Sequence, residues 1–136
     1  MAWKTLIVGA VLLAASCNGA TQPPATKQLH TVRAGDLDVV LLASEATLKQ
    51  GKDTFTIEFR RAGSTTLVDV GTVKVSATMP MAGMPPMMAD AVAMPAGTPG
   101  RYTVNSQLTM AGTWNVGVEW DGPAGKGSTR LSTTAQ

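Results

Sequence analysis

Cysteine, histidine and aromatic residues are scarce in this chain of 136 residues, which has one Cys, one His and 4% aromatic residues. A single cysteine excludes an intramolecular disulfide, so the fold must be stabilised by its hydrophobic core. One histidine and one cysteine cannot supply the ligands of a closed zinc site or a blue-copper site. A Ser-His-acid triad could use only His30, and no local signature accompanies this residue, so we do not expect an enzyme.

Charged residues are also few, at 15% of the chain, whereas hydrophobic residues make up 44%. This composition and length are typical of one globular domain with one core. Arg60 and Arg61 are the only adjacent basic pair, so nothing in the charge pattern indicates binding to nucleic acid. No stretch of the sequence shows a long helical repeat of apolar residues.

The first residues have the pattern of a secretory signal. Lys4 precedes an uncharged apolar run at residues 6–15, which is too short to span a bilayer. The run ends in Leu13-Ala14-Ala15-Ser16-Cys17, which resembles the lipobox of bacterial lipoproteins. We therefore expect residues 1–16 to be a lipoprotein signal peptide.

Cys17 would then be the first residue of the mature chain, with lipid on its sulfur and amine that anchors the protein to a membrane. Ordinary secretion with a free Cys17 is the alternative. Asn18 follows the cysteine, and by resemblance to Gram-negative sorting it favours the outer membrane, with the protein facing the periplasm. Residues 17–28 are rich in Thr, Gln, Pro and Ala and are expected to form a flexible tether before a domain at residues 29–136.

The expected domain has the two-residue period of β-strands. Phe55, Ile57 and Phe59 alternate with polar residues, as in a strand with one buried face. The same pattern predicts strands at residues 37–43, 72–79, 102–110, 114–120 and 129–133. Glycine-containing turns separate these runs, and Glu58 falls among the polar residues expected to face solvent. The fold class is therefore all-β, an antiparallel β-sandwich of about seven strands.

The apolar pattern changes parity between Val70 and Val73, with Gly71 at the change. A bulge or tight bend at this glycine would explain the change. If the strand then continues, Val73, Val75, Ala77, Met79 and Met81 share one face. Side chains two apart on a strand emerge about 6.5–7 Å from each other, a gap that methionine side chains can close around one ion.

Methionine is concentrated in one segment, since six of the eight methionines lie between residues 79 and 94. Thioethers are soft donors that suit Cu(I), so the segment is a candidate copper(I) site. Packing of methionine into an irregular apolar gap is an equally weighted alternative. The segment also contains Pro80, Pro85 and Pro86, which disfavour a helix and predict a stiff loop.

We expect Met79 and Met81 to form the nucleus of this metal site. At least one further sulfur would come from Met84, Met87 or Met88. Thioethers are neutral, so binding does not require a ligand to lose a proton, unlike binding by thiolate or imidazole. Trp114 and Trp120 are expected in the core, although a lid over the ion is a second option for them.

Four segments in order resemble the FixH/YtkA-like family of bacterial envelope proteins. They are Phe55-Thr56-Ile57-Glu58-Phe59, Val73-Lys74-Val75-Ser76-Ala77-Thr78-Met79-Pro80-Met81, Pro99-Gly100-Arg101-Tyr102 and Met110-Ala111-Gly112-Thr113-Trp114. The resemblance implies an immunoglobulin-like sandwich and a link to copper, with copper-efflux or cytochrome-oxidase assembly proteins as partners. Members often carry a histidine in the Met-Pro loop and this chain has none, which leaves Cu(I) or Ag(I) rather than Cu(II).

Two functions follow as hypotheses. The first is an envelope lipoprotein that holds Cu(I) for copper tolerance or for delivery to oxidase assembly. The second is a β-sandwich adaptor without metal, whose Met-Pro segment is a hydrophobic surface for a partner protein.

Overall fold

The structure is a computed structural model that describes residues 27–136. The expected signal peptide, the lipidation site Cys17 and the tether up to residue 26 lie outside the described residues. Eight strands make up the described part: β1 (Lys27–Ala34), β2 (Leu37–Ala43), β3 (Gly51–Arg61), β4 (Thr72–Met81), β5 (Met84–Pro95), β6 (Arg101–Leu108), β7 (Gly112–Gly122) and β8 (Gly125–Ala135). Over residues 27–136 there is no helix of the length and apolar character that a membrane span requires.

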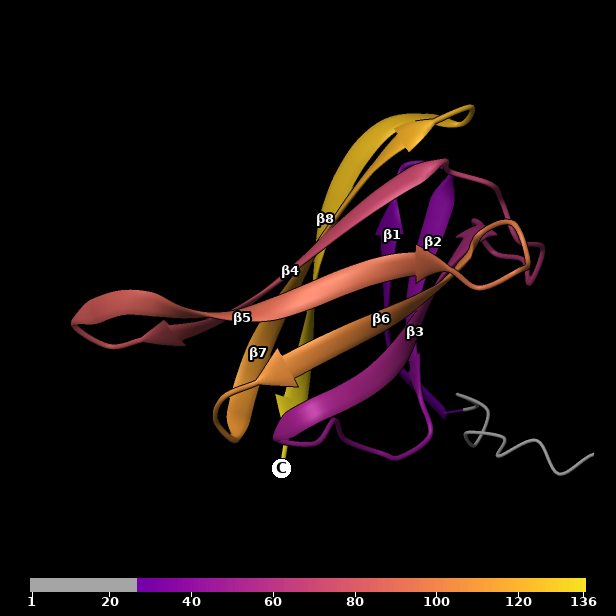
Figure 1. Cartoon of the computed structure of the whole chain (residues 1–136). Helices are drawn as coiled ribbons and strands as arrows, with labels where there is room; N and C mark the ends of the chain where they lie inside the picture. The colour runs from indigo at the N-terminus through magenta and orange to yellow at the C-terminus, as the bar shows by residue number, and fades with distance from the viewer. Residues whose placement is uncertain (1–26) are drawn as a thin grey trace, which may run out of the picture.

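All strand pairs are antiparallel and follow the order β1-β2-β3-β6-β5-β4-β7-β8. The sheet folds over on itself, and β1 also contacts β8, so the two ends of the order meet (Figure 1). This confirms the all-β, immunoglobulin-like sandwich. Residues 27–136 form eight strands where about seven were expected, and neither β1 nor β5 was among the six runs that the alternation predicted. β1 begins at Lys27, two residues ahead of the expected domain boundary at Leu29.

The core lies between the inward faces of the folded sheet. Phe55, Ile57 and Phe59 are buried, in agreement with the alternation along β3. The ring of Phe59 makes edge contacts with Tyr102 at 5.6 Å and with Trp120 at 5.3 Å between centroids. Trp114 is fully buried as well, so the expectation that the two tryptophans belong to the core is confirmed.

Just before β4 begins, the backbone at Gly71 lies in close contact with the backbone of Asp121. Gly71 has φ of 77°, and a Cβ atom here would lie 2.6 Å from the carbonyl oxygen of Asp121. Only glycine therefore fits this bend, which was expected from the change in parity. The hydroxyl of Tyr102 donates to the carbonyl oxygen of Gly71 at 2.6 Å, and burial raises the pKa of Tyr102. These contacts determine where β4 begins and therefore which of its residues face inward.

Glu58 was expected to face solvent, and the structure shows that this is wrong, because its side chain is buried. Arg101 lies opposite Glu58 in the β3–β6 register, and its Nε donates to one carboxylate oxygen at 2.9 Å. The Nε of Arg60 donates to the other oxygen at 2.8 Å. Two guanidinium groups thus cover the carboxylate and provide its hydrogen bonds, which is what allows a charged group to be buried.

The strand assignment predicts a strong difference between neighbouring residues of β3. Ile57 has no exposed surface, so Ile57→Ala is expected to lower the free energy of unfolding by about 2–5 kcal/mol. Thr56 is half-buried on the opposite face, so Thr56→Ala is expected to cost about 1 kcal/mol or less. Urea denaturation of both variants measures the difference. Similar costs for the two variants would contradict the inward orientation of Ile57.

Candidate thioether metal site

The methionines of the expected site lie on a β-hairpin that projects from the body of the protein (Figure 1). Strand β4 pairs with β7 only from Thr72 to Thr78, and β5 pairs with β6 only from Asp90 to Pro95. Beyond these points β4 and β5 pair only with each other. We call residues 79–88 the methionine hairpin. The expectation of a stiff loop after Met79 is therefore wrong, since the segment is two paired strands joined by Ala82 and Gly83.

The register of the hairpin places its methionines in two opposing pairs. Met79 lies opposite Met87, and Met81 lies opposite Met84. Directly opposed residues of an antiparallel pair have Cβ atoms about 4.5–5.5 Å apart, closer than residues two apart on one strand. Met79 and Met81 keep a common face of β4, and the register places a further methionine opposite each of them.

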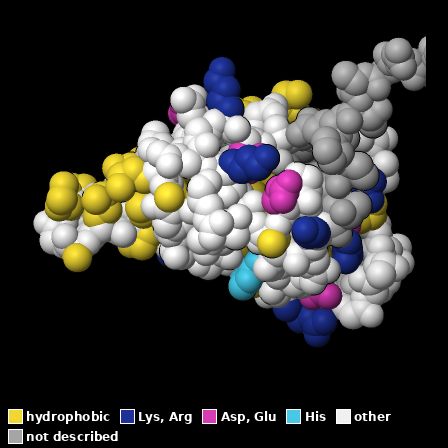
Figure 2. All heavy atoms as spheres, turned by 90° about the horizontal axis from the view of Figure 1, so that it is seen from below, with side chains coloured by type: hydrophobic (Ala, Val, Ile, Leu, Met, Phe, Trp, Pro, Cys, Tyr) yellow, Lys and Arg dark blue, Asp and Glu magenta, His cyan; other side chains and the backbone are white. Residues whose placement is uncertain are grey.

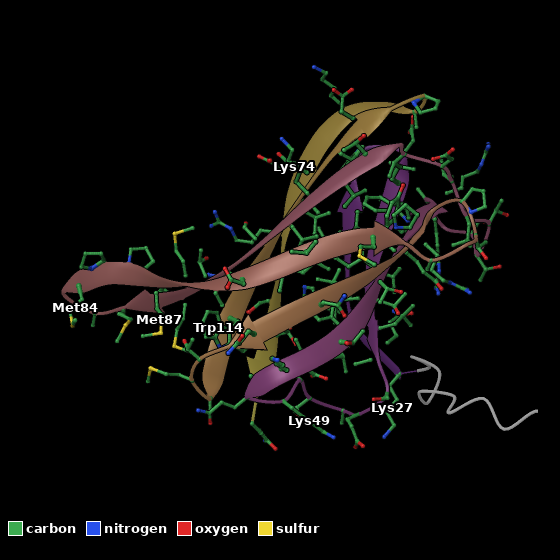
Figure 3. All side chains as sticks on the ribbon, in the orientation of Figure 1. Lys27, Lys49, Lys74, Met84, Met87 and Trp114 are labelled. Carbon is green, nitrogen blue, oxygen red and sulfur yellow. The ribbon has the colours of Figure 1, made fainter. Side chains whose placement is uncertain are left out.

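The two faces of the hairpin differ in exposure. The side chain of Met79 is 8% exposed and that of Met87 is half-buried, so this pair continues the inward face of the sheet. Met88 lies opposite Thr78 and is 72% exposed, on the outward face. Met84, at the tip, is 62% exposed, and its side chain lies on the same side of the hairpin as that of Met87 (Figure 3). The structure therefore brings Met79, Met81, Met84 and Met87 onto one face and separates Met88 from them.

The turn between β6 and β7 lies against the inner pair of methionines. The hydroxyl of Thr109 donates to the sulfur of Met87 at 3.0 Å. Gly112 lies under Met79, because a Cβ atom on Gly112 would be 3.0 Å from Cε and 3.8 Å from Sδ of Met79. The root of the hairpin is thus packed against the body, and sulfur atoms gather around Met87 (Figure 3).

No charged side chain occurs between Lys74 and Asp90 in the sequence, so the whole methionine hairpin is uncharged. Hydrophobic side chains gather on the projection (Figure 2). Across the part of the chain that the structure describes, no group of three His, Cys, Asp or Glu residues could hold a metal ion. His30 lies on β1, which pairs with neither β4 nor β5. The donors that this site offers to a metal are therefore thioether sulfurs.

A family model described as YtkA-like matches residues 31–119, which is more than half of the chain. The chain belongs to the YtkA-like family. This YtkA-like domain includes the methionine hairpin and the β6–β7 turn.

Among solved structures, a copper-bound variant of FetP from uropathogenic Escherichia coli strain F11 is similar to this YtkA-like protein with a TM-score of 0.48. The sequences are 9% identical, and the match covers 79% of this chain and 93% of FetP. A search of the curated proteins found no significant match.

The difference in burial between Met79 and Met88 predicts different costs of truncation. Met79→Ala removes a buried side chain and is expected to cost about 2–5 kcal/mol of unfolding free energy. Met88→Ala removes an exposed one and should stay within about 0.5 kcal/mol of wild type. Chemical denaturation of the two single variants provides the comparison. A larger cost for Met88 would mean that the faces of the hairpin are reversed.

Proposed function

We propose that this YtkA-like protein binds Cu(I) in the cell envelope through the methionine hairpin. The observation that carries the proposal is the pairing of Met79 with Met87 and of Met81 with Met84 on one face. Each pair offers two sulfurs across a strand spacing that flexible methionine side chains can span. Soft thioethers favour Cu(I), and the closely similar soft ion Ag(I), over harder ions.

The lack of charge on the hairpin supports the reduced oxidation state. Cu(II) favours nitrogen and oxygen ligands in a tetragonal arrangement, and the hairpin has no histidine and no carboxylate. Neutral sulfur ligands hold Cu(I) without releasing protons, so binding would not weaken as the pH of the envelope falls. A protein of this kind would hold copper for tolerance or deliver it to a copper-efflux or oxidase-assembly partner.

The proposal predicts that the inward methionines are ligands while the outward ones are not. Met79→Leu with Met87→Leu keeps volume and hydrophobicity, so the fold should lose less than about 1.5 kcal/mol per site. Cu(I) binding should nevertheless be strongly weakened, because only Met81 and Met84 remain as ligands on that face. Met88→Leu with Met94→Leu is the matched control, since both residues are outward and exposed, and it should bind like wild type. Competition with a chromophoric Cu(I) chelator, with a melting curve on each protein, measures both effects.

A metal-free adaptor is the second candidate function. Met88, Val92 and Met94 alternate along the outward face of β5, and each is more than half exposed. Such a row of exposed apolar side chains is typical of a protein-binding surface. Failure of wild type to withdraw Cu(I) from a weak chelator would favour the adaptor. Equal binding by the inward double variant would show that Met79 and Met87 are not the ligands.

Membrane attachment through Cys17 completes the proposed function and has its own test. Cys17→Ser should abolish lipid attachment, so the variant should accumulate unprocessed or appear in the soluble fraction. Wild type should partition into the detergent phase of a cell extract. Processing and detergent partitioning of the variant like those of wild type would show that Cys17 is not the anchor.

A further inference from the structure

Met110 is the one methionine after the initiator that lies outside the segment at residues 79–94, yet the fold returns it to the root of the hairpin. It lies between Thr109, whose hydroxyl donates to the sulfur of Met87, and Gly112, which lies under Met79. Thr109 and Gly112, one before and two after Met110, thus contact Met87 and Met79, the two inner methionines. The β6–β7 turn that carries it is distant in sequence from β4 but adjacent to it in space.

The backbone of Met110 is attached to the core. The indole Nε1 of Trp114 donates to the carbonyl oxygen of Met110 at 2.9 Å, and Trp114 is fully buried. Residue 110 is therefore held in place by the largest fully buried side chain of β7. The side chain of Met110 is 40% exposed, so it is not packed into the core. The backbone of Met110 is thus fixed, and its sulfur is not buried in the core and is accessible to a metal ion.

We propose that Met110 is a third thioether ligand of the inner copper site, together with Met79 and Met87. This inference rests on the proposed function and extends it by adding a ligand from the body of the protein. The hairpin supplies two sulfurs, and the β6–β7 turn supplies the third. The hydroxyl of Thr109 orients the sulfur of Met87 toward this turn, and because a thioether sulfur has two lone pairs, one remains for the metal.

A shared ligand set has a mechanical consequence. A metal ion held only by the hairpin could leave the hairpin free to bend relative to the body. An ion held by Met110 as well would tie the hairpin to the turn, so binding would reduce the motion of the projection. Metal-bound and metal-free forms would then present different surfaces to a partner protein.

The test compares Met110→Leu with Met94→Leu in the purified full-length protein. Loss of even an outer-shell partner typically costs about 10–100-fold in metal affinity, so removal of a ligand should weaken Cu(I) binding by at least about tenfold. X-ray absorption of the Cu(I) form should show three sulfur neighbours in wild type and two in Met110→Leu. Met94→Leu should match wild type in both measurements, because Met94 lies on the outward face.

A second measurement does not depend on a variant that folds. With 13C-labelled methionine methyl groups, addition of Ag(I) to wild type should shift the resonances of Met79, Met87 and Met110, while Met94 stays unchanged. An unshifted Met110, or an unchanged affinity and sulfur count in Met110→Leu, would overturn this inference and leave the two-sulfur hairpin site in place. A wild-type protein that binds neither ion would overturn the proposed function and this inference together.

Discussion

The register of β4 against β5 is the constraint on which the candidate site depends. Side chains alternate between faces along a strand, so a slip by one residue would turn Met79 or Met87 to the opposite face and separate the inner pair. The register is held at the root of the hairpin, because β4 pairs with β7 up to Thr78 and β5 pairs with β6 from Asp90 onward. Gly71 and Tyr102 hold the first end of β4. The position of the sulfurs therefore depends on the backbone pairing of β4 and β5 with their neighbouring strands.

Proline has a role in the hairpin that differs from the stiff loop expected of it. Beyond Thr78 on β4 and before Asp90 on β5, the outer edges of the two strands have no further strand beside them. Exposed apolar edges of this kind tend to pair with other chains. Pro80, Pro85 and Pro86 are exposed and have no N–H to offer to such a partner. They also lie where β5 carries one more residue than β4 between the paired methionines, which interrupts the ladder.

The sequence predicted the central strands and located the methionine-rich segment, but it did not predict how that segment is arranged. Strand β3 was predictable because Phe55, Ile57 and Phe59 alternate with polar residues. Strand β5 was not, because its prolines indicated a loop and its inward residues after Met87 are alanines, which carry little apolar signal. The burial of Glu58 depends on Arg101, which is distant in sequence and becomes a partner only through the β3–β6 register. The contact of the β6–β7 turn with the hairpin could not be predicted either, because the two segments are distant in sequence. The Met110 to Trp114 motif itself was recognised in the sequence.

The graded exposure of the methionines also has a chemical consequence when the protein meets oxidants. Oxidation to the sulfoxide turns an apolar side chain into a polar one, and accessible side chains react most readily. Met88 and Met84, at 72% and 62% exposed, would be oxidised well before Met79, at 8%. Sulfoxides at the tip and on the outward face would leave the buried sulfur of the inner pair intact. The fold therefore protects its innermost thioether from oxidation by burial, whereas the exposed methionines would depend on enzymatic reduction of the sulfoxide.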